Sequence, residues 1–421
     1  MRRAMATAAA GRVCPAGVCL RGLFMRLEVR DRGAEAAPDR SSHGALAVER
    51  SATRAACRLA LRGVGGTHPN PRVGAVILRG GATIARGWHA RAGDPHAEAV
   101  ALTRAGARAR GATLVVTLEP CAHHGRTPPC VDAILAAGIR RVVVGMIDPN
   151  PVVNGRGIEQ LRRAGVDVVV GVLESECRSL NEPYLHALAT GRPWVTLKAM
   201  VSLDGRLATD AGESRGLGGA EEQRLCHRLR AQHDAVLVGI GTVLADDPRL
   251  TVRHARGGSP RRILLDSALR VPETAALFED AGGAPVVIAT TSRDEARGRA
   301  LEQRGGRLWC FDPDPEGRVP LRPLLERMVA EGIYALLVEG GTAVHTAFLR
   351  AGFANRVAIG IAPLLLGGRT PRSWTGDLGR GALADAIEIS DLRVRRAGRD
   401  LWLEGAVHGA DGVAPAERRH V

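Results

Sequence analysis

Short apolar runs of the kind that form buried strands alternate with helix-like segments along most of this chain. Such alternation is typical of an α/β fold, in which helices cover both faces of a largely parallel sheet. The alternation stops near Gly191, where a glycine and a nearby proline end a predicted helix, and then it starts again. The two halves share no obvious repeat. We therefore expect two different α/β domains, which suits a length of 421 residues.

Each half has its own set of expected elements. In the first half we expect helices over 48–62, 95–106, 130–137 and 158–164, and strands over 73–78, 83–87, 114–118, 141–146 and 166–170. In the second half we expect strands over 194–200, 235–238, 262–265, 285–289 and 335–338, with helices between them. The predicted domains are residues 46–190 and 191–412, followed by a tail over 413–421.

Residues 1–45 differ from the rest of the chain. They begin with several arginines before the first acidic residue, Glu28, and they lack sustained periodicity. We expect a disordered extension, or a translation start placed upstream of a true start such as Met25. An organelle transit peptide is the alternative that the composition leaves open.

The charge balance of the chain is basic, with Lys+Arg 58 against Asp+Glu 44. Lys198 is the sole lysine, and the arginines are scattered rather than interleaved with aromatic residues, so we expect no nucleic-acid partner. A lone lysine among arginines indicates a position that needs a compact, titratable amine, with chance survival as the alternative. No apolar window is long enough to span a bilayer. The chain has 8 cysteines and no recognisable secretion signal, so we expect it to lie in a reducing cytoplasm.

Three motifs in the first half contain groups that bind transition metals: His96-Ala97-Glu98, Glu119-Pro120-Cys121 and Cys130. One histidine and two thiolates leave the fourth position of a zinc ion open, as sites that activate water require. Glu98 is too near His96 to bind the same ion easily, but it can stand beside the water as a proton shuttle. His96 and Cys130 each open a predicted helix, whose N-terminus favours a thiolate.

Each of these motifs alone has a plain structural explanation. An isolated histidine is more often structural than metal-binding, and two cysteines nine positions apart are usually unrelated. The three motifs occur together and in order, each between a predicted strand and a predicted helix. That combination favours a zinc deaminase site.

The spacing of the cysteines separates this chain from most zinc deaminases. Nucleoside and tRNA deaminases usually have Pro-Cys-x-x-Cys, whereas eight residues lie between Cys121 and Cys130. That insertion and the upstream segment Thr-His-Pro-Asn-Pro-Arg-Val-Gly, residues 67–74, closely resemble the deaminase half of the bifunctional riboflavin-biosynthesis deaminase/reductase family. The resemblance covers roughly residues 48–190. It implies a cytidine-deaminase-like, three-layer α/β/α domain that binds Zn²⁺.

The same resemblance implies a reaction for the first domain. The substrate would be 2,5-diamino-6-ribosylamino-4(3H)-pyrimidinone 5′-phosphate, which would lose an exocyclic amine as ammonia. Glu98 would move the protons, and Asn70 and His68 would contact the substrate. A turn-forming role for Asn70 is an equally good alternative.

The second half lacks a Gly-x-Gly-x-x-Gly motif after its strands, so a Rossmann dinucleotide fold is not supported. The strand that ends at Val338 runs instead into Glu339-Gly340-Gly341 and a predicted helix. A strand, two glycines and a helix N-terminus suit either a phosphate cradle or an ordinary tight turn.

Segments 198–205, 241–253 and 339–341 resemble the reductase half of the same family, which is related to dihydrofolate reductase in fold. The resemblance covers about residues 192–370 and implies NADPH as the cofactor. The implied cofactor contacts are Met200, Thr242, Asp246, Gly341, Thr342, Ala343, Val344, His345, Thr346 and Ala347. The implied substrate contacts are Ser214, Arg230, Leu250, Arg253 and Glu339. Hydride would pass to the ribose carbon, with Lys198 and Asp246 as polar partners, and arginines suit the substrate phosphate.

One segment departs from the family pattern. The family usually has a tryptophan and then a small hydroxyl residue shortly after Ser214, and this chain has Gly216 at the tryptophan position, which would face the cofactor. The departure leaves open a deaminase whose reductase-like domain is impaired or only a scaffold. An RNA-acting zinc deaminase is a further alternative, which the cysteine spacing disfavours. We expect a cytoplasmic homo-oligomer that converts a phosphorylated pyrimidine in two steps, without a membrane or nucleic-acid partner.

Overall fold

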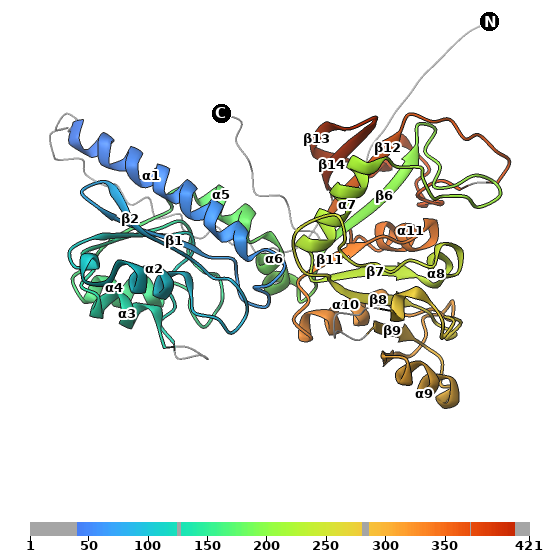
Figure 1. The fold of residues 1–421 in the computed structure, drawn as a ribbon, viewed down its shortest axis with the longest axis horizontal. Coiled ribbons are helices and arrows are strands. Elements are labelled where there is room, and N and C mark those ends of the chain that lie inside the picture. Colours follow the sequence, from blue (N-terminus) through green and yellow to red (C-terminus); the bar gives the residue numbers. More distant parts are fainter. Residues whose placement is uncertain (1–39, 124–127, 280–285, 371, 409–421) are drawn as a thin grey trace, which may run out of the picture. The chain divides into compact units, whose positions relative to one another are not determined.

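The structure is a computed structural model of the 421-residue chain, and it describes residues 40–123, 128–279, 286–370 and 372–408 (Figure 1). The chain divides into the units Met1–His43 and Gly44–Val421. Residues 1–39 of the predicted extension, which was expected over 1–45, and the predicted tail over 413–421 lie outside the described residues. The first described helix, α1 (Arg40–Ala60), begins before the predicted domain limit at residue 46.

The first domain is built on a five-stranded sheet with the strand order β2-β1-β3-β4-β5. Its strands are β1 (Gly74–Arg79), β2 (Ala82–Trp88), β3 (Thr113–Val116), β4 (Arg141–Val144) and β5 (Asp167–Val170). Its further helices are α2 (Ala97–Ala105), α3 (Cys130–Ala136), α4 (Arg156–Arg163), α5 (Glu174–Leu180) and α6 (Glu182–Thr190). The predicted helices and strands of this half all occur. Their ends differ by a few residues, except that α1 begins at Arg40 rather than at residue 48.

The pairing of β1 corrects the expectation of a largely parallel sheet in this half. β3, β4 and β5 are parallel, but β1 pairs antiparallel with both β2 and β3. Gly80 and Gly81 connect β1 to β2 with φ of 57° and 80°, a left-handed conformation that glycine adopts readily. A two-residue connection of this kind forces an antiparallel hairpin.

Helices cover both faces of the first sheet, so the predicted three-layer α/β/α arrangement is confirmed (Figure 1). On one face, α2, α3 and α4 bury residues such as Ala101, Ile134 and Leu161 against alternate strand positions. On the other face, α1 packs Ala56 and Leu59 against the sheet. The zinc-binding motifs lie on the face that α2 and α3 cover.

The second domain contains a nine-stranded sheet with the order β10-β9-β8-β7-β11-β6-β12-β14-β13. Its strands are β6 (Trp194–Ser202), β7 (Ala235–Gly239), β8 (Arg261–Leu265), β9 (Val286–Thr290), β10 (Gly306–Cys310), β11 (Ala335–Val338), β12 (Arg356–Ala362), β13 (Ile389–Ala397) and β14 (Asp400–Val407). Its helices are α7 (Ala220–Gln232), α8 (Ile240–Asp246), α9 (Glu295–Gln303), α10 (Leu321–Ala330) and α11 (Thr342–Arg350).

The second sheet is parallel from β10 to β12 and antiparallel only at the β14–β13 end. The predicted α/β class is therefore confirmed for this half as well. β10, β12, β13 and β14 were not expected. The strand β13 lacks an apolar signal because most of its side chains are exposed. Among the described helices, none is long and apolar enough to cross a membrane.

The central strands of the second sheet bring distant segments together. β7, β11, β6 and β12 are neighbours, so the segments at their carboxyl ends lie along one edge of the sheet. The residues after β11 include Glu339 and the N-terminus of α11, and the residue after β7 begins α8. This edge gathers most of the predicted reductase residues, as parallel α/β sheets generally do for their ligand sites.

Candidate active sites

Three metal-binding side chains meet in the first domain. His96 directly precedes α2, Cys130 is the first residue of α3, and Cys121 lies in the loop after β3. The Nδ1 atom of His96 lies 3.2 Å from the Sγ atom of Cys130 and 3.6 Å from that of Cys121. All three ligand atoms lie within 4.8 Å of one another. Zinc bonds of about 2.3 Å to sulfur and about 2.0 Å to nitrogen would reach all three atoms. The three predicted ligands therefore fit one zinc ion with a coordination position left over.

The pKa values of the two thiols of this triad shift in opposite directions. Hydrogen bonding to Cys130 lowers the pKa of Cys121 to about 4 although burial opposes it, and His96 lowers it further. The pKa of the Cys130 thiol is raised, first by its hydrogen bond to Cys121 and then by burial. A divalent cation would displace the proton of the Cys130 thiol and stabilise both thiolates.

Glu98 lies in the first turn of α2, beside the triad but outside the ligand set. Glu98 is only 4% exposed. Burial, and then the charge of Cys121, raise the pKa of this carboxyl group to about 7. A carboxyl group that titrates near neutrality can both accept and donate a proton. The geometry thus suits the predicted proton shuttle.

A cavity of about 410 Å³ opens onto His96, Glu98 and Cys121. Asn70 lines it, as predicted. The Nδ1 atom of His89 lies 3.2 Å from the carbonyl oxygen of Pro95, which accepts a hydrogen bond. The Nε2 atom of His89 then accepts one from the Asn70 side-chain amide at 3.1 Å, and this contact orients the amide in the cavity.

His68 does not line this cavity. Its Nδ1 atom instead lies 2.7 Å from the carboxylate of Asp234, and the His68 side chain is 3% exposed. The structure therefore does not place His68 where it was expected to contact the substrate, because its side chain pairs with Asp234 instead.

The sequence patterns gave no role to several polar residues that line the cavity, among them His89, Asp148, Asn150 and Tyr184. The hydroxyl group of Tyr184 donates to Asp148 at 3.0 Å, and the Asn150 amide donates to that hydroxyl oxygen at 3.4 Å. Asp148 and Asn150 belong to the Asp-Pro-Asn-Pro run that follows β4. Polar turn residues directly after a buried strand were the signal that could have identified them.

In the second domain, two predicted substrate residues bind each other. The guanidinium group of Arg230 donates to both carboxylate oxygens of Glu339, at 2.6 Å and 2.8 Å. It also donates to the carbonyl oxygen of Thr251 at 3.1 Å. Most donors of Arg230 are used in this way, so the arginine orients Glu339 rather than offering an open fork for phosphate.

The other predicted substrate arginine, Arg253, is exposed. Its side chain donates to Thr251 Oγ1 at 2.9 Å, and its backbone N–H donates to His227. The Leu250 side chain is buried in the core and its φ is 58°, so only its backbone could reach a ligand. Arg253 is therefore the better placed of the two arginines for an anionic group.

Predicted cofactor and substrate residues also meet beside α8. The Ser214 hydroxyl group donates to the carboxylate of Asp246 at 2.7 Å. Thr242 lies near Gly341, because a Cβ atom added to Gly341 would be 3.8 Å from the Thr242 Oγ1 atom. A Cβ atom on Gly340 would lie 2.6 Å from Val344, so glycine is needed for this tight approach to α11.

The N-terminus of α11 is the part of the predicted cofactor segment that suits a phosphate. No side chain caps the helix at Gly341. Its first backbone N–H groups, from Gly341 to Ala343, can therefore donate to an anion. Further along, His345 is fully buried against Trp374, and Thr346 hydrogen-bonds Thr342 and Gly376. Val344 packs inward beneath Gly340, and Ala347 lies one turn later on the same helix.

Gly216, at the position where the family usually has tryptophan, has a φ of 81°. A Cβ atom there would meet nothing within 4 Å. Arg399 donates to the Gly216 carbonyl oxygen at 3.3 Å and to that of Leu217 at 3.1 Å. Gly216 thus leaves open the space that a larger side chain would fill, and Arg399 holds the backbone at this position.

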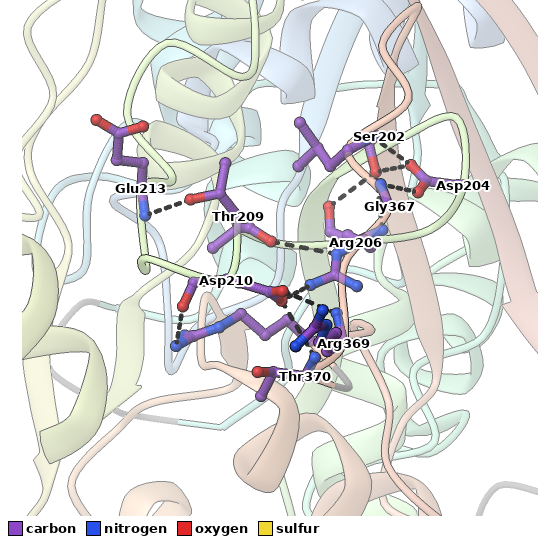
Figure 2. Close-up of polar contacts among 12 residues, drawn as sticks. Ser202, Asp204, Arg206, Thr209, Asp210, Glu213, Gly367, Arg369 and Thr370 are labelled. Carbon is purple, nitrogen blue, oxygen red and sulfur yellow. Dashed lines mark hydrogen bonds and ion pairs between the residues drawn. The ribbon is translucent and has the colours of Figure 1, made fainter.

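Hydrogen bonds connect two loops, residues 203–213 and 366–370, as Figure 2 shows. Asp204 accepts hydrogen bonds from the backbone N–H groups of Leu366 at 3.1 Å and Gly367 at 2.8 Å. Asp210 accepts one from the backbone of Arg369 at 2.7 Å and one from the Arg206 side chain at 2.7 Å. These contacts position the segment that leads from β6 to Ser214.

Comparison with known families agrees with this geometry. Residues 47–146 match the family model described as the cytidine and deoxycytidylate deaminase zinc-binding region. This stretch contains all three residues of the triad and Glu98. The fold and the site therefore define a protein that joins a zinc-binding deaminase domain to a second α/β domain.

Residues 193–403 match a second family model, the RibD C-terminal domain. The riboflavin biosynthesis protein RibD of Aquifex aeolicus is 41% identical over 355 residues, which cover 84% of this chain and 97% of that protein. The Escherichia coli protein of the same name is 40% identical over 83% of this chain and 96% of its own length. The chain belongs to the RibD family.

Solved structures give the same assignment. RibD of Acinetobacter baumannii matches with a TM-score of 0.77 and 37% identity, over 86% of this chain and 99% of that one. A diaminohydroxyphosphoribosylaminopyrimidine deaminase/5-amino-6-(5-phosphoribosylamino)uracil reductase from Thermotoga maritima matches with a TM-score of 0.76 and 34% identity, with the same coverage. Both comparisons extend over the two domains.

Proposed function

We propose that this chain performs two consecutive steps of riboflavin biosynthesis. The first is hydrolytic deamination of 2,5-diamino-6-ribosylamino-4(3H)-pyrimidinone 5′-phosphate. The second is NADPH-dependent reduction of the ribosyl group, which gives 5-amino-6-ribitylaminouracil 5′-phosphate. The observation that supports this function best is the convergence of His96, Cys121 and Cys130 on one cavity that also contains Glu98.

In the first step, water adds to the ring carbon that bears the amine, and ammonia leaves. His96, Cys121 and Cys130 would hold zinc, and the chemistry that zinc supplies is Lewis-acid activation of water. Glu98 accepts a proton from the attacking water and delivers it to the departing amine. Asn70, oriented by His89, offers its amide to the substrate inside the cavity.

In the second step, the chemistry that NADPH would supply is hydride transfer to the ribose carbon, and a proton from solvent would complete the reduction. The free N–H groups at the start of α11, together with Thr242, would bind a phosphate of the cofactor. Arg253 would bind the substrate phosphate, and Asp246 is oriented by Ser214. Lys198 would place an ammonium group in the same site as Glu339.

The experiment that tests this function is product analysis by mass spectrometry with the diaminopyrimidine phosphate, with and without NADPH. Without NADPH, the product should have oxygen in place of one amine. With NADPH, it should also have gained two hydrogens. If the amine is retained under both conditions, the deaminase assignment is wrong.

A second candidate follows from Gly216, whose surroundings lack the expected tryptophan. In that case the second domain would bind ligands or act as a scaffold without reduction. NADPH oxidation measured with the deaminated substrate separates the two, since only a working reductase consumes the cofactor.

Three further properties are part of the proposal. The domain limits would be 46–190 and 191–412, and the family matches over 47–146 and 193–403 support them. The chain would be cytoplasmic and would form a homo-oligomer. Sedimentation of the purified chain would test the last point.

A further inference from the structure

The buried carboxylate of Glu222 has no role in either proposed reaction step, and it lies beside Lys198, the sole lysine of the chain. The Lys198 Nζ atom lies 2.9 Å from the Oε1 atom of Glu222, and the two side chains are 12% and 4% exposed. Lys198 belongs to β6, and Glu222 lies in the first turn of α7. A charge pair this deep is unfavourable to bury unless the partners are well oriented.

Two glycines from different elements make room for this carboxylate. A Cβ atom on Gly218 would clash with the Oε2 atom of Glu222 and lie 3.0 Å from its Cδ atom. A Cβ atom on Gly360, which pairs with Met200 across β12 and β6, would lie 3.2 Å from the Glu222 Cγ atom. Gly218 falls in the segment that departs from the family pattern. The glycine-rich segment after Ser214 therefore leaves the space that the Glu222 side chain occupies.

Charged and titratable groups surround the Lys198 amine on several sides. α7 contributes Glu222, Cys226 and Arg230, Glu339 follows β11, and α11 contributes His345. Burial lowers the pKa of Lys198, but Cys226, Glu222 and Glu339 together outweigh it, so the pKa lies above its usual value. Arg230 already neutralises Glu339 through two hydrogen bonds. Glu222 is thus the carboxylate that balances the ammonium charge.

We propose that Glu222 is a positioning residue of the reductase site, which holds the Lys198 ammonium group in place beside Glu339 for the reduction step. The proposal rests on the proposed reductase activity of the second domain. Glu222 acts through Lys198 and does not itself touch the substrate. Its removal would leave a buried cation without its closest anion.

The sole lysine allows a direct test in the full chain. With ¹³Cε-labelled lysine, one side-chain resonance reports on Lys198 alone. In the wild type this resonance should stay at the ammonium position throughout the pH range in which the chain is folded. In Glu222→Gln it should titrate within that range, because the variant removes the charge and keeps the shape. An unchanged resonance overturns the proposal.

Kinetics with the deaminated substrate supply the second measurement. Glu222→Gln should reduce the kcat of NADPH oxidation by about tenfold or more, with a smaller change in KM, since ground-state binding does not need the ammonium position. Gly218→Thr, which displaces the carboxylate without altering its charge, should act in the same direction. Glu221→Gln is the matched control, because Glu221 is exposed and pairs with Arg224.

The outcomes separate this proposal from the function on which it rests. Loss of thermal stability in Glu222→Gln with unchanged kcat means a structural role and overturns the proposal. If wild-type chain consumes no NADPH, the reductase function fails, and the positioning role fails with it. The Lys198 resonance then still reports whether Glu222 controls the amine.

Discussion

His96 and Glu98 lie two residues apart, and the proposed mechanism gives them different tasks because α2 begins between them. His96 has φ −66° and ψ 159°, which is extended backbone, so its ring turns toward the two cysteines. Glu98 is already helical and points into the cavity from the first turn. The start of a helix thus separates the proposed metal ligand from the proposed proton-transfer group within one short motif.

The first prediction concerns this division. Glu98→Gln should reduce deamination by roughly 10²- to 10⁴-fold, which is the usual contribution of a general acid–base group. Zinc content should remain at the wild-type level, because Glu98 is outside the ligand set. Deamination is measured by ammonia release and zinc by elemental analysis. Cys130→Ser is the comparison variant and should lose both activity and zinc. Retained zinc in that variant would contradict the ligand assignment.

At the level of elements, the loop from β6 to Ser214 depends on a second loop, residues 363–370. Asp204 accepts hydrogen bonds from Ser202, Gly367 and Leu366, which lower its pKa to about 2. The pKa of Asp210 is also lowered, first by the backbone N–H groups of Arg369 and Thr370. Because the folded-state pKa of both groups is depressed, these contacts are complete above about pH 4 and weaken below it. For Asp204 the loss extends toward pH 2.

The second prediction tests this loop contact. Asp210→Asn should raise the KM for the deaminated substrate by roughly three- to tenfold, because an exposed charge-assisted contact that orients the Ser214 segment is lost. Far-ultraviolet circular dichroism should not change. Asp312→Asn provides the control, since Asp312 forms an exposed pair with Arg293 on another loop. Equal KM values in the two variants would show that the contact does not position the site.

At the level of the whole molecule, buried neutral histidines make the second domain sensitive to acid. Burial is the main cause that lowers the pKa of His227 to about 4 and that of His233 to about 4. In the unfolded chain both groups would titrate near 6.5. As the pH falls below 6.5 the unfolded chain therefore binds more protons than the folded one, and stability decreases until about pH 4.

The third prediction follows from this loss of stability at acidic pH. Urea unfolding of the second domain should require less denaturant at pH 5 than at pH 7.5, with His233 alone contributing on the order of 2 kcal/mol. Tryptophan fluorescence is a suitable probe, because Trp194, Trp309, Trp374 and Trp402 lie in this domain and only Trp88 lies in the first. His233→Gln should flatten the pH dependence. The opposite slope would contradict neutral, buried histidines.

The sequence by itself determined the α/β class, the division into two domains and the zinc triad. These properties depend on local patterns: strand and helix periodicity, punctuation by glycine and proline, and the order of His96, Cys121 and Cys130. Each ligand begins or follows a predicted element, so its approximate position could be inferred without knowing the packing. Local patterns singled out only Lys198 and the segment 339–341 in the second half, and the resemblance to a known family supplied the other reductase residues.

Only the tertiary structure decided how distant side chains pair. It turned β1 antiparallel, removed His68 from the cavity, joined Arg230 to Glu339, and placed Glu222 against Lys198. Such pairs depend on strand order, on register and on the space that residues such as Gly218 leave open. These are properties of elements far apart in the chain, and periodicity along a single segment contains no information about them.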